Sequence, residues 1–145
     1  MTVTFCGHSD CYENDEIRQR LYETVEAEIL KGAELFYLGG YGHFDSMAAR
    51  VVWELKKKYP HIQSVLVLAY LNRAVDTKYY DRTTYPPLEN TPLRYAISKR
   101  NEWTVEQADT VIAYVTHGWG GAAQTLQVAK RKHKRIINIA EEAAK

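Results

Sequence analysis

The sequence predicts an α/β fold built on a mostly parallel sheet of five strands. Short β-rich apolar segments alternate along the chain with longer segments in which apolar residues recur at helical spacing. Such alternation is typical of right-handed βαβ units, which place their strands in one parallel sheet. The segment 64–70 is apolar rather than alternating, which suits a strand covered on both faces. With 145 residues, 46% of them hydrophobic, we expect one domain over residues 1–145.

The predicted elements follow one another in a regular order. Helical spacing is clearest in the first helix, where an apolar residue recurs at every fourth position from Ile17 to Ile29. Strands are expected at residues 2–6, 34–38, 64–70, 109–115 and 135–139. Helices are expected from Asn14 or Asp15 to Gly32, over residues 43–58, over residues 93–107 and directly after Gly121, with a short tail over residues 140–145.

Residues 72–92 lack regular periodicity and are expected to form a long loop. Loops of this length inside compact domains are usually functional or disordered. The tyrosines and charged residues of the segment favour a lid or a partner surface, and the alternative is a surface loop fixed by tyrosine packing.

Two glycine-rich turns each follow a predicted strand and precede a predicted helix. Glycine tolerates positive φ and lets a ligand approach the backbone, while a helix N-terminus offers free N–H groups and a positive dipole end. Neither turn has the Walker ending or the dinucleotide fingerprint, which disfavours ATP hydrolysis and an ordinary NAD dehydrogenase. The first turn contains Gly39, Gly40, Gly42 and Asp45, and the second contains His117, Gly118, Gly120 and Gly121.

The loops that follow the strands should meet at one edge of the sheet. Parallel strands end at the same edge, and open α/β sheets bind ligands there, at the point where the strand order reverses. Gly7 and His8 follow the first strand, and Asn72 and Arg73 follow the third. Together with the two glycine turns they predict a pocket for a nucleotide-like ligand.

Charge and composition exclude several other classes of function. Nineteen Lys and Arg against eighteen Asp and Glu give a formal charge of +1, so no global field favours nucleic acid or a membrane. The basic run 130–135 is interpreted as a solvated helix end. The sequence shows no signal peptide and no apolar run long enough to span a bilayer, so a cytoplasmic protein is expected. Cys6 and Cys11 are expected to be free thiols rather than metal ligands.

Several segments together resemble the SLOG superfamily, which includes the Smf/DprA and Lonely Guy proteins. Residues 39–49, with the sequence Gly-Gly-Tyr-Gly-His-Phe-Asp-Ser-Met-Ala-Ala, resemble its glycine, aspartate and alanine pattern. Residues 85–89, 97–101, 108–109 and 120–125 resemble its small YpsA-like branch. The resemblance implies a Rossmann-like three-layer sandwich and a nucleotide or nucleotide-derived ligand, bound by a sensor or by an enzyme that processes it. It also raises the expectation of a homodimer.

The chain departs from the Lonely Guy pattern at the position of that family's catalytic glutamate. Lonely Guy enzymes cleave the base from a nucleoside monophosphate with a Pro-Gly-Gly-Gly-Thr motif that a glutamate follows, and the corresponding residues 120–127 contain no carboxylate. N-glycosidic cleavage needs a nearby carboxylate, and Asp45 is the candidate for that catalytic role among the converging loops. Asp45 could instead cap free N–H groups or hold ribose hydroxyls, which favours a binding module over a hydrolase. The DprA resemblance suggests single-stranded DNA, against which the near-neutral charge argues.

The remaining candidate residues take binding roles in this interpretation. Arg100 or Arg73 would pair with a phosphate, since Arg forms bidentate charge-assisted contacts, and Asn101 lies beside Arg100. A tyrosine would close over the base by stacking. His8 and His117 are interpreted as polar contacts rather than catalysts, and no cofactor or metal is expected. The tyrosines in question are Tyr79, Tyr80 and Tyr85.

Overall fold

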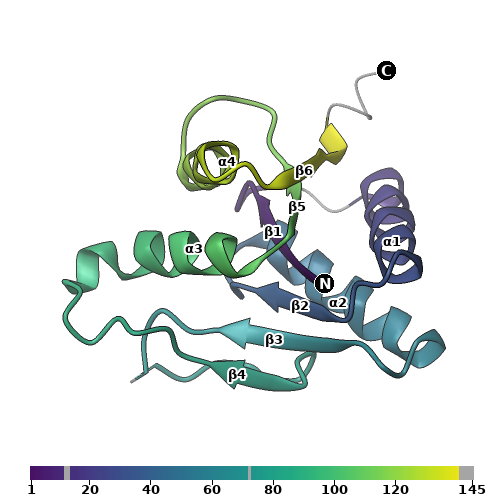
Figure 1. Cartoon of the computed structure of the whole chain (residues 1–145), viewed down its shortest axis with the longest axis horizontal. Coiled ribbons are helices and arrows are strands. Elements are labelled where there is room, and N and C mark those ends of the chain that lie inside the picture. The colour runs from purple at the N-terminus through teal and green to yellow at the C-terminus, as the bar shows by residue number, and fades with distance from the viewer. Residues whose placement is uncertain (12–13, 72, 141–145) are drawn as a thin grey trace.

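The computed structural model describes residues 1–11, 14–71 and 73–140, which form a parallel sheet with helices on both faces (Figure 1). The strands are β1 (Thr2–Gly7), β2 (Leu35–Leu38), β3 (Gln63–Val67), β4 (Arg82–Thr84), β5 (Thr110–Tyr114) and β6 (Arg135–Asn138). The helices are α1 (Asp15–Leu30), α2 (His43–Lys58), α3 (Ala96–Gln107) and α4 (Gly121–Arg131), and a 3-10 turn, η1 (Leu93–Tyr95), precedes α3. The predicted α/β class is therefore confirmed. The predicted tail beyond residue 140 and the predicted loop position Asn72 lie outside the described residues.

The sheet has six strands rather than the predicted five, in the order β4-β3-β2-β1-β5-β6, and each pair in it is parallel. The additional strand, β4, lies inside the segment predicted to be an irregular loop. Its Arg-Thr-Thr sequence has no apolar residue, because an edge strand exposes much of its surface. Asp81 aligns it with β3, since its carboxylate accepts from the Ser64 N–H at 2.8 Å and its own N–H donates to the Ser64 carbonyl at 2.9 Å.

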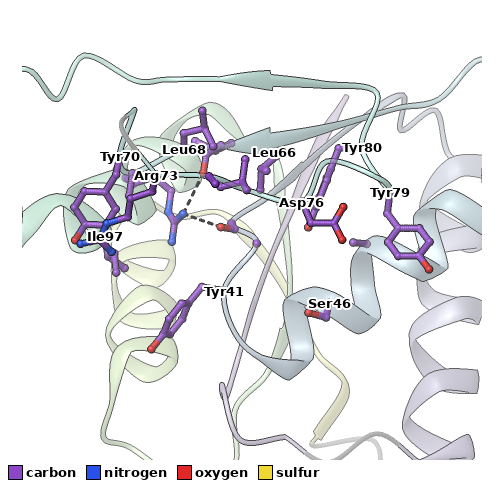
Figure 2. Close-up of a pocket in the computed structure, with 18 of the residues that line it drawn as sticks. Tyr41, Ser46, Leu66, Leu68, Tyr70, Arg73, Asp76, Tyr79, Tyr80 and Ile97 are labelled. Atoms are coloured by element: carbon purple, nitrogen blue, oxygen red, sulfur yellow. Dashed lines mark hydrogen bonds between the residues drawn. The ribbon is translucent and has the colours of Figure 1, made fainter.

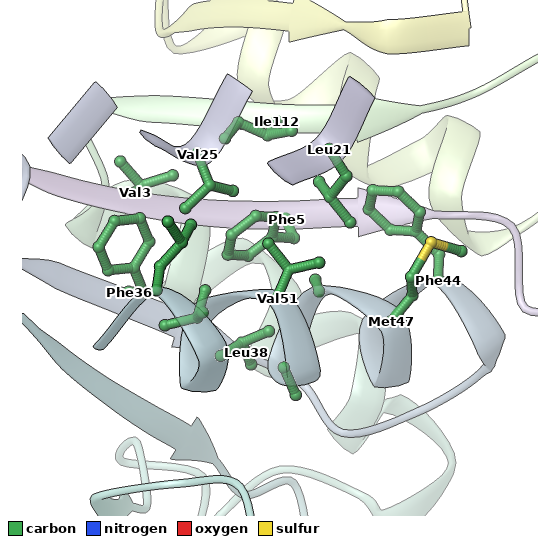
Figure 3. Close-up of a cluster of buried hydrophobic side chains, with 14 of the residues drawn as sticks. Val3, Phe5, Leu21, Val25, Phe36, Leu38, Phe44, Met47, Val51 and Ile112 are labelled. Atoms are coloured by element: carbon green, nitrogen blue, oxygen red, sulfur yellow. The ribbon is translucent and has the colours of Figure 1, made fainter. Parts of the chain in front are cut away.

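Two apolar cores lie on opposite faces of the sheet, under α1 and α2 on one side and under α3 and α4 on the other. Side chains of a strand alternate between the faces, so Phe5 of β1 joins the first core and Cys6 joins the second. Likewise, Ile112 of β5 faces the first core and Val111 the second. Figure 3 shows the first core, where α1 contributes Leu21 and Val25 and α2 contributes Met47 and Val51.

Local signals correctly predicted the limits of the first helix. The side chain of Asn14 accepts from the Ile17 N–H at 2.8 Å and caps the start of α1, and Gly32 follows its end with a φ of 112°.

The third strand ends at Val67, three residues before the predicted end, although the Leu68 N–H still bonds the Thr84 carbonyl at 2.8 Å.

The strand order reverses at β1, which has β2 on one side and β5 on the other. The chain leaves β1 toward α1 on one face and leaves β5 toward α4 on the other. The two loops therefore diverge, and this divergence creates a crevice at the carboxyl edge of the sheet. Within the described residues, no helix is long and apolar enough to cross a membrane.

Candidate functional site

A cavity of about 310 Å³ occupies this crevice, and we call it the switch-point cavity. Its walls come from the loop after β1, the loop after β5, the start of α4 and one side of α3. Eight of the predicted site residues line it: Gly7, His8, Asp45, Arg100, Asn101, His117, Gly120 and Gly121. The fold thus brings together predicted residues that are far apart along the chain.

A second cavity, of about 480 Å³, lies at the carboxyl ends of β2 and β3, and we call it the tyrosine cavity (Figure 2). Gly39, Gly40 and Arg73 line this cavity, with tyrosines from the 70–80 segment. The two cavities adjoin, because Tyr41, Ile97 and Arg100 line both. The structure therefore distributes the predicted site over two compartments. Gly42 and Gly118, both in the described part of the chain, are not among the residues lining either compartment.

The Gly42 turn is closed by protein packing at the start of α2. The His43 N–H donates to the Ser9 carbonyl at 3.0 Å. A Cβ on Gly42, whose φ is 91°, would lie 2.7 Å from the Ser9 Cα, and a Cβ on Gly7 would lie 2.2 Å from the Phe44 ring. These glycines permit the loop after β1 to pack against α2, so their role at this contact is close approach of backbone rather than anion binding.

Gly39 leaves room for a charge pair formed by the half-buried Asp45 and the buried Arg100. A Cβ there would lie 2.9 Å from Oδ2 of Asp45 and 3.2 Å from Cζ of Arg100. The Arg100 side chain is buried, and its Nη1 donates to the Gly39 carbonyl at 2.9 Å and to the Val67 carbonyl at 3.1 Å. Its Nε donates to Oδ1 of Asn101 at 2.9 Å. Arg100 therefore joins the ends of β2 and β3 to α3, and much of its donor capacity is already used.

The environment of Asp45 raises the pKa of its carboxyl group. Burial raises its pKa from 3.8 to about 6, against the opposing effects of Arg100 and of backbone hydrogen bonds from Tyr41 and Gly39. These two N–H groups belong to the turn before α2 and not to the helix itself, whose N-cap residue is Gly42 and which has no side-chain cap. Burial also lowers the pKa of Arg100, and Asp45 opposes that shift.

The turn before α4 differs from the turn before α2 because it is open. Gly120 has a φ of 92°, and α4 begins without a side-chain cap. A Cβ built on Gly118, Gly120 or Gly121 would meet no atom within 4 Å. The first N–H groups of a helix have no intrahelical partner, and here they lie at the wall of the switch-point cavity. This turn therefore has the geometry of an anion site.

Three aromatic rings form a continuous stack beside that turn. The rings of His8 and His117 lie 3.8 Å apart at 14°, and those of His117 and Trp119 lie 3.7 Å apart at 15°. The stack begins in the protein interior, where Nε2 of the buried His8 accepts from the Thr116 N–H at 2.9 Å. Burial lowers the pKa of His8, as does His117, while Asp10 raises it. Sequence reasoning missed Trp119, although its position between two glycines after a strand was a visible signal.

The tyrosine cavity contains two of the three tyrosines expected to stack on a base, Tyr79 and Tyr80. Figure 2 shows Arg73 beside Tyr70 at one end of the cavity and these two tyrosines at the other. The guanidinium of Arg73 lies 3.9 Å from the Tyr70 ring centroid. Tyr85 is not among the residues that line either cavity.

The thiols and other metal-ligating groups near the site do not combine into a metal centre. Cys6 lines the switch-point cavity, and burial raises its pKa to about 12, so it stays protonated at neutral pH. Cys6 and Cys11 are both buried. Within residues 1–11, 14–71 and 73–140, no three His, Cys, Asp or Glu side chains are grouped so that they could hold a metal ion.

Comparison with known proteins identifies relatives in both sequence and fold. No family model matches the chain. A UPF0398 protein of Halalkalibacterium halodurans is 26% identical over 132 residues, which cover 82% of this chain and 70% of that protein. DNA processing protein A (DprA) of Helicobacter pylori, described with a single-stranded DNA binding mode, matches with a TM-score of 0.65 and 14% identity. The resemblance to the SLOG superfamily is confirmed.

Two further solved structures have the same fold. DprA of Streptococcus pneumoniae matches with a TM-score of 0.65 at 15% identity, and the Moco carrier protein of Chlamydomonas rheinhardtii with 0.58 at 12%. The matches cover 94% of this chain for the first DprA, 93% for the second and 98% for the carrier protein. The SLOG-like chain spans 63% and 48% of the two DprA structures and 78% of the carrier protein. At these identities the likeness is one of fold.

Proposed function

We propose that this SLOG-like chain is a binding module for a nucleotide or nucleotide-derived small molecule, held in the switch-point cavity. One observation carries the proposal: the open turn of Gly120 and Gly121, the Arg100 and Asn101 side of α3, and the exposed ring of Trp119 face a single cavity. Nucleotides combine an anion, a polar sugar and a planar base, and this cavity offers a surface suited to each.

The phosphate would lie at the start of α4. Backbone N–H groups and the positive dipole end favour an anion there, and a glycine at positive φ keeps the approach free of side chains. Arg100 adds positive charge behind the cavity, although its hydrogen bonds to Gly39 and Val67 give it mainly a positioning role. Of the two glycine turns predicted to form the nucleotide pocket, the proposal therefore assigns the phosphate to the second, at Gly120 and Gly121.

Asp45 would position the sugar and hold the turn before α2. Its carboxylate already accepts backbone hydrogen bonds and pairs electrostatically with Arg100, which suits a fixed binding group. The alternative, a hydrolase of the N-glycosidic bond, needs Asp45 as its reacting carboxylate. The two differ in turnover: chromatography of AMP incubated with the protein would yield free adenine only for the hydrolase.

The second candidate function is single-stranded DNA binding, which the shared fold with the DprA proteins favours. Binding to the phosphate backbone would weaken steeply as salt rises, whereas a single bound phosphate gives a shallow dependence. Titration of a labelled single-stranded oligonucleotide at two salt concentrations separates this function from nucleotide binding.

A charge substitution at the start of α4 tests the nucleotide proposal directly. Gly121→Asp has open space for its side chain, and a carboxylate at a helix N-terminus favours folding, yet it repels a bound phosphate. Gly118→Asp makes the same charge change at a position that is equally open and lines neither cavity. Binding is first screened by thermal shift with nucleoside mono-, di- and triphosphates, NAD and ADP-ribose. Each nucleotide that shifts the Tm is then titrated by calorimetry.

We expect a member of this panel to bind the wild-type chain, Gly121→Asp to lose at least about tenfold in affinity, and Gly118→Asp to bind as wild type. Absence of binding across the panel would overturn the proposal. Equal affinity of the wild type and Gly121→Asp would mean that the phosphate does not bind at the start of α4.

A further inference from the structure

The three-ring stack ends in a ring that has one face covered and one face open. Trp119 is 71% exposed, although large aromatic side chains are usually covered. Its covered face lies on His117, and His117 in turn lies on His8. The interplanar angles of 14° and 15° keep the rings almost parallel, so a further planar ring could extend the stack at the same spacing.

The loop holds the Trp119 ring without burying it. The neighbours Gly118 and Gly120 have no side chains, and a Cβ on either would meet no atom within 4 Å. The position of the ring therefore depends on the histidines beneath it. His8 is itself fixed, because it is buried and accepts the Thr116 N–H at Nε2. The result is a supported aromatic surface beside the open start of α4.

An unsatisfied atom within the stack also indicates a missing partner. Nδ1 of His117 is buried and has no hydrogen-bond partner among the described residues. Buried polar atoms without a partner are rare in native proteins and usually have a ligand, a water or a functional reason. His117 lines the switch-point cavity, so a polar group of a bound ligand could reach this atom.

We propose that Trp119 is the base-stacking residue of this chain and that it takes a planar heteroaromatic ring, such as a purine base, on its open face. This inference rests on the proposed nucleotide function and names the part of the ligand that the Trp119 ring recognises. It places the base at the loop after β5 rather than in the tyrosine cavity. Tyr79 and Tyr80, which were expected to stack on a base, are half-buried there, and Tyr79 already packs against Trp53 with a centroid distance of 6.3 Å.

The test compares a ligand that has a base with one that lacks it. AMP and ribose 5-phosphate share the sugar and phosphate, so only a base-stacking residue distinguishes them. Calorimetry with both probes is performed on wild type, Trp119→Ala and Trp119→Phe. Trp103→Ala is the control, because Trp103 packs against Tyr37 with a centroid distance of 5.9 Å and lines neither cavity. Tryptophan fluorescence follows the same titrations, since Trp119 is the exposed one of the three tryptophans.

We expect Trp119→Ala to weaken AMP binding by roughly tenfold or more, because stacking on an aromatic side chain contributes substantially per base. Ribose 5-phosphate binding should stay unchanged, Trp119→Phe should restore most of the AMP affinity, and Trp103→Ala should bind as wild type. AMP should quench the fluorescence of the wild type, and Trp119→Phe should lose this quenching.

The outcomes separate the stacking proposal from the proposed function. If wild type binds AMP and ribose 5-phosphate equally well and Trp119→Ala changes neither, stacking is overturned while nucleotide binding stands. An equal loss of affinity for AMP and ribose 5-phosphate in Trp119→Ala would mean that Trp119 maintains the structure of the loop and does not stack on the base. If Trp119→Ala sediments as a smaller species than the wild type and its AMP binding is unaffected, the Trp119 ring contacts another protein chain instead of a base, and stacking is overturned. If neither probe binds the wild type but another member of the nucleotide panel does, stacking of the AMP base is overturned while nucleotide binding stands. If no member of the panel binds, the proposed function fails and stacking fails with it.

Discussion

Gly39→Ala should destabilise the fold by crowding the charge pair of Asp45 and Arg100. Gly39 is not in the positive-φ region, so the effect comes from contact rather than from backbone strain. The new Cβ would lie 2.9 Å from Oδ2 of Asp45 and 3.2 Å from Nη2 of Arg100. Neither side chain can move freely, because Arg100 bonds the Gly39 and Val67 carbonyls and Asp45 accepts N–H groups of the turn.

The magnitude of the destabilisation combines one stabilising and two destabilising terms. Overpacking of a well-packed site costs about 1–3 kcal/mol, while replacing glycine by alanine stabilises by about 0.4–1 kcal/mol through the unfolded chain. Displacement of the Arg100 bond to the Gly39 carbonyl would add about 1.5–3 kcal/mol, since hydrogen bonds to charged groups are the stronger ones. Together these terms give an expected net loss of about 3.5 kcal/mol, which lowers the Tm by roughly 7–14 °C in a domain of this size.

Urea denaturation followed by circular dichroism measures the loss, and Gly118→Ala is the matched control. Gly118 also lies outside the positive-φ region, and a Cβ there would meet no atom within 4 Å. Its substitution should change the free energy of unfolding by no more than about 0.5 kcal/mol. Wild-type stability in Gly39→Ala would refute the reasoning, as would an equal loss in Gly118→Ala.

Two further predictions concern the same charge pair. The folded-state pKa of Asp45, about 6 instead of 3.8, means that the native state binds more protons than the unfolded state between these values. The contribution of Asp45 to the free energy of unfolding is therefore complete below pH 3.8 and is lost as the pH rises through 6. The loss amounts to up to about 3 kcal/mol. Urea unfolding of the wild type and of Asp45→Asn at pH 4 and pH 7 measures it. A pH-independent difference between the two proteins would contradict this. Arg100→Lys should lose about 2–4 kcal/mol, because lysine has no Nε to bond Asn101 and its nitrogen lies one bond short of Nη1, which donates to both strand-end carbonyls. The exposed Arg94→Lys should be neutral within about 0.5 kcal/mol. An Arg100→Lys variant as stable as Arg94→Lys would show that the guanidinium is not needed to join the strands.

The sequence determined the elements that depend on local and periodic signals. Helix α2 was predicted over residues 43–58 and is found over His43–Lys58, because its apolar stripe and the flanking Gly42 and Pro60 mark both ends. The parallel arrangement followed from the alternation of strands and helices, and it brought the loops after β1 and β5 to one edge. Most of the residues of the switch-point cavity could be named for that reason.

Only the tertiary structure decided which residues share a compartment and what each of them contacts. Strand β4 has no apolar pattern, and its pairing depends on contacts between Asp81 and Ser64. The bonds of Arg100 to Gly39 span 61 positions, and the His8 bond to the Thr116 N–H spans 108. Contacts over such separations depend on the path of the backbone between them, which no local pattern encodes. The stack that supports Trp119 is of this kind: its rings come from opposite sides of the strand-order reversal, and only the folded sheet brings them together.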